Sequence, residues 1–311
     1  MSKLTYKLTD SNPIRADVVV QKLTGKPRSQ VRGMFDHRCI TVDGALCLDP
    51  GVLVGAGTEV VVEFDPERRY KEIPKARQSK VFDLVFEDDW ILVVDKKAGY
   101  LTVPTEQREP NTLVGALSVY LTRGGSRRKL VSIVHRLDRD TSGLLVFAKD
   151  DKTAELIKQQ FADRKPMREY VAIVAGHLPA ESGTFKSHLY TDQYLNQRST
   201  KDEDKGKLAI THYRVTEVLK DSTAVSVTLE TGRRNQIRVH FAEKGHPVLG
   251  DVRYKTELAA HKNWRVKRLA LHAAVLGFTH PVSMKKLVFR SQLPGEFTQF
   301  YKQESAKVSS R

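Results

Sequence analysis

One carboxylate stands out by its surroundings in the sequence. Asp138 lies in a polar loop that ends in a turn at Ser142-Gly143 and is flanked by two apolar, strand-like runs. Loops between rigid elements commonly carry catalytic groups, because the flanking strands hold the side chain in place. An aspartate in this position can act as a nucleophile or as a base. The alternative is a basic surface turn in which Asp138 pairs with Arg136 or Arg139.

Further motifs follow this loop along the chain. They are Arg-Glu-Tyr-Val-Ala at 168–172, Lys-Leu-Ala-Ile-Thr-His-Tyr at 207–213, Thr-Gly-Arg-Arg-Asn-Gln-Ile-Arg-Val-His at 231–240, Gly-His-Pro-Val-Leu-Gly-Asp at 245–251, Leu-His-Ala at 271–273 and Phe-Thr-His-Pro at 278–281. Together with His-Arg-Leu-Asp-x-x-Thr-Ser-Gly at 135–143, they resemble the motifs of the RluA-type pseudouridine synthases. The resemblance covers roughly residues 82–297, and several ordered motifs are far more specific than any single one.

The resemblance implies roles for four residues. Asp138 matches the family's catalytic aspartate, and Arg238 matches the arginine that forms a salt bridge with it. Tyr170 matches a tyrosine whose ring stacks on the target uracil and whose hydroxyl can assist proton removal from carbon 5. Arg136 matches a residue that enters the space left by the flipped-out nucleotide. The alternatives are a surface arginine for Arg238, a core tyrosine for Tyr170 and a phosphate contact for Arg136.

Two segments depart from the family pattern. Residues 96–99 read Lys-Lys-Ala-Gly where Lys-Pro-Ala-Gly is common, and residues 233–235 read Arg-Arg-Asn where Arg-Thr-His or Arg-Lys-His is common. Neither departure touches Asp138, Tyr170 or Arg238. They bear instead on which RNA contacts, and hence which substrate, the chain shares with other members.

The implied reaction converts uridine to pseudouridine. It breaks the bond from ring nitrogen 1 to the ribose, turns the base and rejoins it through carbon 5, with no net redox change and no cofactor. It needs a carboxylate beside the ribose, a pocket for the detached base and a group that takes the proton from carbon 5. The sequence leaves open whether Asp138 attacks the sugar carbon, adds to the base, or removes a sugar proton to give a glycal-like intermediate.

Arg238 is expected to keep the carboxylate of Asp138 ionised. Burial disfavours the charged form of an aspartate, so a cation must lie beside it. The pattern predicts a helix over about residues 236–244, stopped by Gly245, with Arg238 in its first turn and Asn235 as its cap. The start of a helix adds a favourable potential for an anion.

The charge balance favours a polyanionic partner. The 311 residues include 52 Lys and Arg against 37 Asp and Glu, which gives a formal net charge of +15. Nucleic acid fits this balance; a membrane does not, because the sequence has no long basic amphipathic helix, lipidation signal or apolar spanning run. Cys39 and Cys47 are too few for a disulfide framework and the N-terminus lacks a signal core, so a cytoplasmic protein is expected.

The pattern predicts an α+β protein with two domains. Residues 1–65 are expected to form a small module of two short helices followed by short strands, and residues 66–80 a basic linker with two prolines. Residues 81–301 are expected to form a catalytic domain on a large, mostly antiparallel sheet, and residues 302–311 a disordered tail. Helices in the catalytic domain are predicted at 112–121, 152–163 and 236–244.

The small module resembles the RNA-binding module named after ribosomal small-subunit protein four, in which a basic helix and a following loop lie against RNA. Its second predicted helix carries Arg28 and Arg32 four residues apart, on a face away from its apolar side. Further RNA contacts are expected at Arg127 and Arg128, in a glycine-hinged basic loop, and at Arg233. The alternative for these arginines is a solvated basic surface.

A metal site is not expected from the histidines of the motifs. No His-x-x-x-His pair on one helix and no Cys-x-x-Cys accompanies them. The histidines concerned are His135, His240, His246, His272 and His280.

The substrate is expected to be large-subunit ribosomal RNA, acted on by a monomer. An accessory RNA-binding module joined to an RluA-type domain resembles the arrangement of that family's large-subunit rRNA enzymes. Transfer RNA is the alternative within the same class. A non-catalytic RNA-binding assembly factor is the alternative outside it, but such a factor should have lost Asp138, Tyr170 or Arg238, and all three are present.

Overall fold

The structure is a computed structural model that describes residues 2–9, 12–37, 39–47, 49–70, 79–107, 109–122 and 131–305. The chain divides into two compact units, Met1–Arg77 and Gln78–Arg311, each with an apolar core of its own. Within the ranges just given, no helix is both long enough and apolar enough to cross a bilayer.

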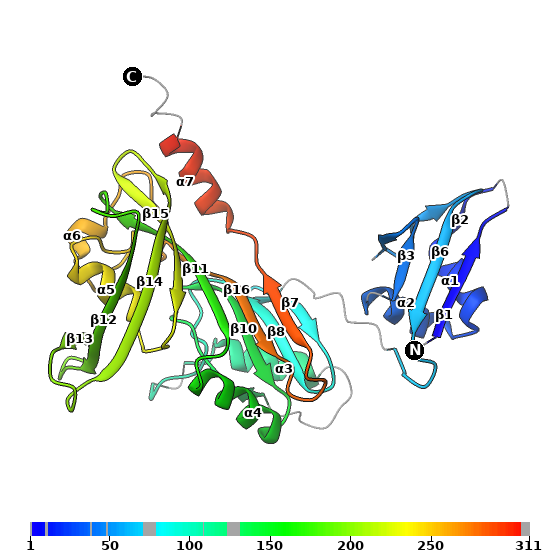
Figure 1. Ribbon diagram of the computed structural model, residues 1–311, viewed down its shortest axis with the longest axis horizontal. Helices are drawn as coiled ribbons and strands as arrows, with labels where there is room; N and C mark the ends of the chain where they lie inside the picture. Colours follow the sequence, from blue (N-terminus) through cyan, green and yellow to red (C-terminus); the bar gives the residue numbers. More distant parts are fainter. Residues whose placement is uncertain are drawn as a thin grey trace. The chain divides into compact units, whose positions relative to one another are not determined.

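The first unit combines the two predicted helices with short strands (Figure 1). Its elements are β1 (Ser2–Lys7), β2 (Ile14–Arg15), α1 (Ala16–Thr24), α2 (Arg28–Asp36), β3 (Ile40–Val42), β4 (Ala45–Leu46), β5 (Leu53–Val54) and β6 (Glu59–Phe64). One sheet has the order β1-β6-β3-β4, and β2 pairs with β5. Sequence analysis missed β1, because its side chains are mostly exposed and show no buried apolar face.

The first unit continues beyond residue 65, where sequence analysis ended it. Tyr70 is buried in the same core as Val20 and Phe35, and its hydroxyl accepts a hydrogen bond of 2.7 Å from the backbone N–H of Asp65. Residues 66–70 therefore belong to the module and not to the predicted basic linker. Most of the remaining linker, residues 71–78, lies outside the described residues.

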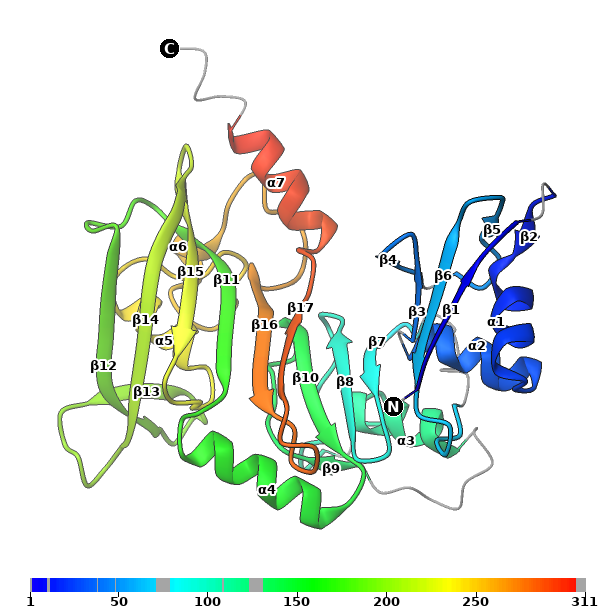
Figure 2. The ribbon, with the colours of Figure 1, turned by 45° about the vertical axis from the view of Figure 1, so that its right-hand side comes forward.

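The second unit is built on one large sheet (Figures 1 and 2). Among the described residues its strands run in the order β13-β12-β14-β15-β11-β16-β10-β8-β7, with β17 on β16 and β9 on β10. All of these pairs are antiparallel except β10 with β16, so the predicted α+β class with a mostly antiparallel sheet is confirmed. The strands are β7 (Phe82–Glu87), β8 (Ile91–Lys96), β9 (Ser132–Ile133), β10 (Ser142–Ala148), β11 (Met167–Ala175), β12 (Ser182–Thr191), β13 (Gln197–Thr200), β14 (Lys207–Val218), β15 (Ser222–Leu229), β16 (Leu271–Thr279) and β17 (Lys286–Arg290).

Helices cover both faces of this sheet around β10, in which every residue is buried. Leu145 and Phe147 pack into the main core with α3, whereas Leu144 and Val146 pack on the other face with Ile157 of α4. The three predicted helices are confirmed within two residues at each end. The helices of this unit are α3 (Leu113–Thr122), α4 (Asp151–Ala162), α5 (Gln236–Glu243), α6 (Thr256–Ala259) and α7 (Gly295–Ser305).

The C-terminal helix corrects the expectation of a disordered tail from residue 302. Helix α7 continues to Ser305, and Glu304 is completely buried. Sequence analysis missed this last turn because its residues are polar. Residues 306–311 lie outside the described part of the chain.

Gly143 allows β10 to lie close to β16 just after the loop of Asp138. Its φ is +118°, and a Cβ at this position would lie 2.3 Å from the backbone oxygen of Ala273. A side chain here is therefore excluded both by the backbone conformation and by a backbone atom that cannot move aside. This close approach lies where the parallel pairing of β10 with β16 occurs.

We expect Gly143→Ala to lower the free energy of unfolding of the second unit by about 3 kcal/mol or more. The energy of the strained φ and that of the overlap with a backbone atom add to each other. Denaturant unfolding measures the loss. Gly295→Ala is the control, because a Cβ there meets nothing within 4 Å, and it should change stability by less than about 0.5 kcal/mol. Equal stability of the two variants would contradict the close approach.

Candidate active site

The backbone around Asp138 is fixed on both sides. The Thr102 hydroxyl donates to the carbonyl of Leu137 at 2.8 Å and accepts from the N–H of the same residue at 3.1 Å. The carbonyl of Arg139 accepts from the N–H of Gly99 at 2.9 Å. The carboxylate thus stands on a loop whose neighbouring peptide groups are held by the segment that follows β8.

Lys96, at the end of β8, binds the same loop. Its side chain is fully buried, and Nζ donates to the carbonyls of Lys97 at 2.9 Å, Tyr100 at 2.8 Å and Arg139 at 2.9 Å. Burial lowers the pKa of Lys96 to about 7, against the opposing effect of nearby carboxylates that include Asp138. Three carbonyls match the three N–H donors of an ammonium group, so Lys96 joins the Asp138 loop to its neighbouring turn.

Arg238 bridges two carboxylates. Its Nη1 lies 3.3 Å from Oδ2 of Asp138, whereas Nε and Nη2 bind both oxygens of Asp251 at 2.7 and 2.8 Å. The side chains of Arg238 and Asp251 are 11% and 0% exposed, so this fork-to-fork pair is shielded from water. Asp251 therefore orients the guanidinium, and one N–H remains directed at Asp138, which is 23% exposed.

The electrostatics of this triad keep Arg238 charged. Burial lowers the pKa of Arg238, but hydrogen bonds and charge from Asp251, with a smaller contribution from Asp138, outweigh burial and raise the pKa above its usual range. Arg238 thus stays a cation at every physiological pH. At 3.3 Å its Nη1 places a positive charge beside the carboxylate of Asp138.

The start of α5 differs from the sequence prediction in one respect. Asn235 precedes the helix, but it has a left-handed φ of 55° and its side chain makes no capping hydrogen bond. Its amide instead donates to the Tyr254 hydroxyl at 3.0 Å and accepts from Nη1 of Arg238 at 3.2 Å. The ring of Tyr254 lies under the guanidinium, 5.1 Å from its carbon. Asn235 thus helps to position Arg238 and does not cap α5.

Tyr170 reaches the site through the strand register. It pairs with Ala273 of β16, and Ala273 pairs with Gly143 of β10. Tyr170 therefore lies two strands from Gly143, where the Asp138 loop ends. The residue is 8% exposed. Burial raises the pKa of Tyr170; the charge of Arg168 opposes this rise and that of Asp138 adds to it. The phenol is therefore neutral at physiological pH.

The predicted RNA-binding arginines lie on different parts of the chain. Arg136 is exposed two residues before Asp138, and Arg233 is exposed with Nε donating to the carbonyl of Leu208 at 2.9 Å. Arg28 is exposed at the start of α2, in the first unit. Arg32 is on the same helix. Arg127 and Arg128 lie outside the described residues.

All five motif histidines have hydrogen-bond partners within the protein. Burial lowers the pKa of His135 to about 3 and those of His240 and His272 to about 4, so these rings are neutral. The partners are Val146 N–H for His135, Ser187 and Thr211 for His240, the Ala175 carbonyl for His246, Ser142 for His272 and Asp88 for His280.

Sequence analysis did not assign a role to Asp251 or Lys96. A signal for Asp251 existed. A buried arginine whose expected partner is one partly exposed carboxylate needs a further anion, and Asp251 is the acid of the motif at 245–251. Lys96 gave no such signal. Its three partners are backbone carbonyls, which any sequence supplies.

Comparisons with known proteins indicate the same family as the motifs. The model of the family described as RNA pseudouridylate synthase matches residues 90–243. The chain is 36% identical, over 90% of each chain, to ribosomal large subunit pseudouridine synthase D of Zymomonas mobilis, and 33% identical to the protein of that name from Pseudomonas aeruginosa, over 90% of this chain and 88% of the relative. The fold resembles that of human RNA pseudouridylate synthase domain containing 4, with a TM-score of 0.59 and 20% identity over 71% of this chain and 92% of that one.

The fold, the ordered motifs and these relatives agree on one class of enzyme. The chain belongs to the RNA pseudouridylate synthase family, and within it to the RluA type.

Proposed function

We propose that the protein converts specific uridines of large-subunit ribosomal RNA to pseudouridine in the cytoplasm, as a monomer that uses no cofactor. The observation that carries the proposal is the Arg238 guanidinium held 3.3 Å from the carboxylate of Asp138, at the site where the motifs place the reaction. The names of the relatives from Zymomonas mobilis and Pseudomonas aeruginosa support the ribosomal substrate.

In this proposal Asp138 acts on the nucleotide while its surroundings hold it in position and place a positive charge beside it. Lys96 and Thr102 fix the loop, and Arg238 supplies the positive charge. The face of Tyr170 receives the uracil, because base stacking on an aromatic ring contributes about 1–3 kcal/mol and tolerates rotation of the base. The neutral phenol suits stacking and hydrogen bonding to the base better than proton abstraction as a phenolate.

RNA binding is assigned to basic side chains on both units. The exposed Arg136 is proposed to fill the space left by the extruded nucleotide, whose unstacking costs a few kcal/mol. Arg233, close to the start of α5, is proposed to contact the RNA backbone. Arg127 and Arg128, in the basic loop predicted from the sequence, are proposed to contact it too. The first unit, through Arg28 and Arg32 of α2, is proposed to bind RNA in the manner of the small ribosomal-protein module that it resembles.

The substrate is tested by mapping pseudouridines in cells that lack the gene, using chemical modification and sequencing. We expect pseudouridines in large-subunit ribosomal RNA to disappear, and to return when the wild-type gene is supplied but not when Asp138→Asn is supplied. Loss confined to transfer RNA would assign the alternative substrate. Restoration by Asp138→Asn would instead indicate an assembly factor whose presence, not catalysis, matters.

Affinity for RNA should fall steeply with salt, by about tenfold or more between 50 and 200 mM, because each phosphate contact releases counterions. Filter binding or fluorescence anisotropy with a ribosomal RNA fragment measures the slope. Arg28→Gln should make the slope shallower by about one if α2 contacts a phosphate. A flat response to salt would contradict binding through the basic surface.

A further inference from the structure

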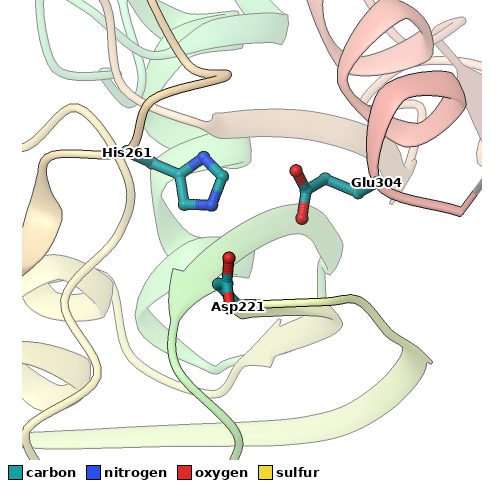
Figure 3. Close-up of side chains that lie close together, drawn as sticks. All are labelled: Asp221, His261 and Glu304. Atoms are coloured by element: carbon teal, nitrogen blue, oxygen red, sulfur yellow. The ribbon is translucent and has the colours of Figure 1, made fainter. Parts of the chain in front are cut away.

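Three potential ligand side chains meet away from the motifs described above. Asp221 comes from the turn between β14 and β15, His261 from the loop after α6 and Glu304 from the last turn of α7. Figure 3 shows the imidazole and the two carboxylates directed toward one another. One ligand atom of each lies within 4.8 Å of those of the other two. Widely separated segments therefore converge on one point.

Glu304 is the most unusual member of this cluster. It is 0% exposed, and its Oε1 accepts a hydrogen bond of 2.5 Å from the side chain of Asn263. Its Oε2 is buried and has no hydrogen-bond partner among the described residues. Nε2 of His261 is also buried, and no described residue forms a hydrogen bond with it. A carboxylate oxygen shielded from water and left without a donor is strongly unfavourable. A positively charged ligand between these atoms would give each of them a partner.

We propose that Asp221, His261 and Glu304 bind a divalent transition-metal ion, with Zn²⁺ as the best match. One imidazole nitrogen and two carboxylate oxygens are donors that Zn²⁺ accepts in proteins, and water would complete a tetrahedral set. Metal bonds of about 2.0–2.2 Å place tetrahedral donor atoms about 3.5 Å apart, so a pair near the 4.8 Å limit has to close by about 1 Å or more. The exposed Asp221 can make this movement by side-chain rotation.

Two existing contacts have to change when the ion binds. Nδ1 of His261 accepts from the backbone N–H of Asn263 at 3.2 Å, and this weak bond is exchanged for a proton on Nδ1 when Nε2 binds the metal. Lys262 lies 3.4 Å from Oδ2 of Asp221 and is 57% exposed, so it can turn into water. Neither contact is strong enough to compete with three metal bonds.

The ion would have a structural role, independent of the proposed reaction. It would join the last turn of α7 to the β14–β15 turn and to the loop after α6. His261 is not one of the motif histidines considered in the sequence, and its two partners lie far from it along the chain. This explains why no spacing pattern indicates the site.

The test uses the full chain without a polyhistidine tag, freed of metal with a chelator and then titrated with ZnCl₂. We expect one saturable site by calorimetry and a rise in the midpoint of thermal unfolding. Asp221→Asn, at an exposed position that folding tolerates, should weaken Zn²⁺ binding at least tenfold. Glu304→Gln should also weaken it at least tenfold, yet leave the metal-free protein as stable as wild type or more stable, since it removes an unpaired buried charge.

Glu203→Gln, an exposed carboxylate outside the cluster, is the control and should bind Zn²⁺ like the wild type. Absorption of the Co²⁺ form gives a second readout, with a tetrahedral spectrum that Asp221→Asn abolishes. The proposal is overturned if no single site saturates, or if Asp221→Asn and Glu304→Gln bind Zn²⁺ as tightly as the Glu203→Gln control.

Discussion

Asp138→Asn should reduce pseudouridine formation by roughly 10⁴-fold or more, the scale expected when an essential group is removed, and leave RNA affinity within about twofold of wild type. The amide keeps the shape of the side chain but removes its charge and basicity. The fold should survive, because Arg238 keeps its two-pronged pair with Asp251 and is not left as an unpaired buried cation.

Activity is measured as tritium released from carbon 5 of labelled uridine in RNA, and affinity by filter binding. Asp140→Asn is the matched control, since it removes a carboxylate from the same loop two residues away. We expect this control to retain activity within about tenfold of wild type. Turnover by Asp138→Asn near the wild-type rate would refute the catalytic role, as would an equal loss in both variants.

Asp251→Asn should lower the free energy of unfolding by about 3–5 kcal/mol, because it leaves the buried guanidinium of Arg238 with only its longer contact to Asp138 as a charged partner. The variant also weakens the acceptor for the backbone N–H groups of Arg253 and Tyr254, which bind Oδ1 at 2.8 and 3.1 Å. The folded fraction should also lose activity, since Arg238 is no longer oriented toward Asp138. Denaturant unfolding and single-turnover kinetics measure the two effects separately.

The control for this variant is Glu155→Gln, which breaks the exposed pair between Glu155 and Lys158 on α4. Surface pairs of this kind contribute less than about 1 kcal/mol. If Asp251→Asn were no more destabilising than Glu155→Gln, the guanidinium would not depend on Asp251. The assignment of Asp251 as the residue that orients Arg238 would then be wrong.

The sequence was sufficient to predict several of the elements around the candidate site. Apolar patterns predicted α3, α4 and α5, and the ordered motifs singled out Asp138, Tyr170 and Arg238 as candidate site residues. Such features are local, because consecutive residues determine a helix or a polar loop between strands. The mostly antiparallel sheet also follows from short strands separated by turns.

The sequence was insufficient where a residue's role depends on a distant partner. The burial of Tyr70 and Glu304 depends on packing against other segments, so polar composition alone suggested a linker and a tail there. Asn235 has the right type for a cap, but Tyr254 and Arg238 compete for its side chain. Local propensity loses to tertiary hydrogen bonds in such cases.

The hydroxyl of Thr102, which binds both the N–H and the carbonyl of Leu137, limits how the enzyme can meet its substrate. In the proposed reaction, the carboxylate of Asp138 can approach a ribose only by rotation of its side chain, because the backbone beside it is held. The nucleotide therefore has to leave its stack to reach the carboxylate. The free-energy cost of this movement is lower for a uridine that is loosely stacked. Selection among uridines then depends partly on how easily each site in the RNA deforms.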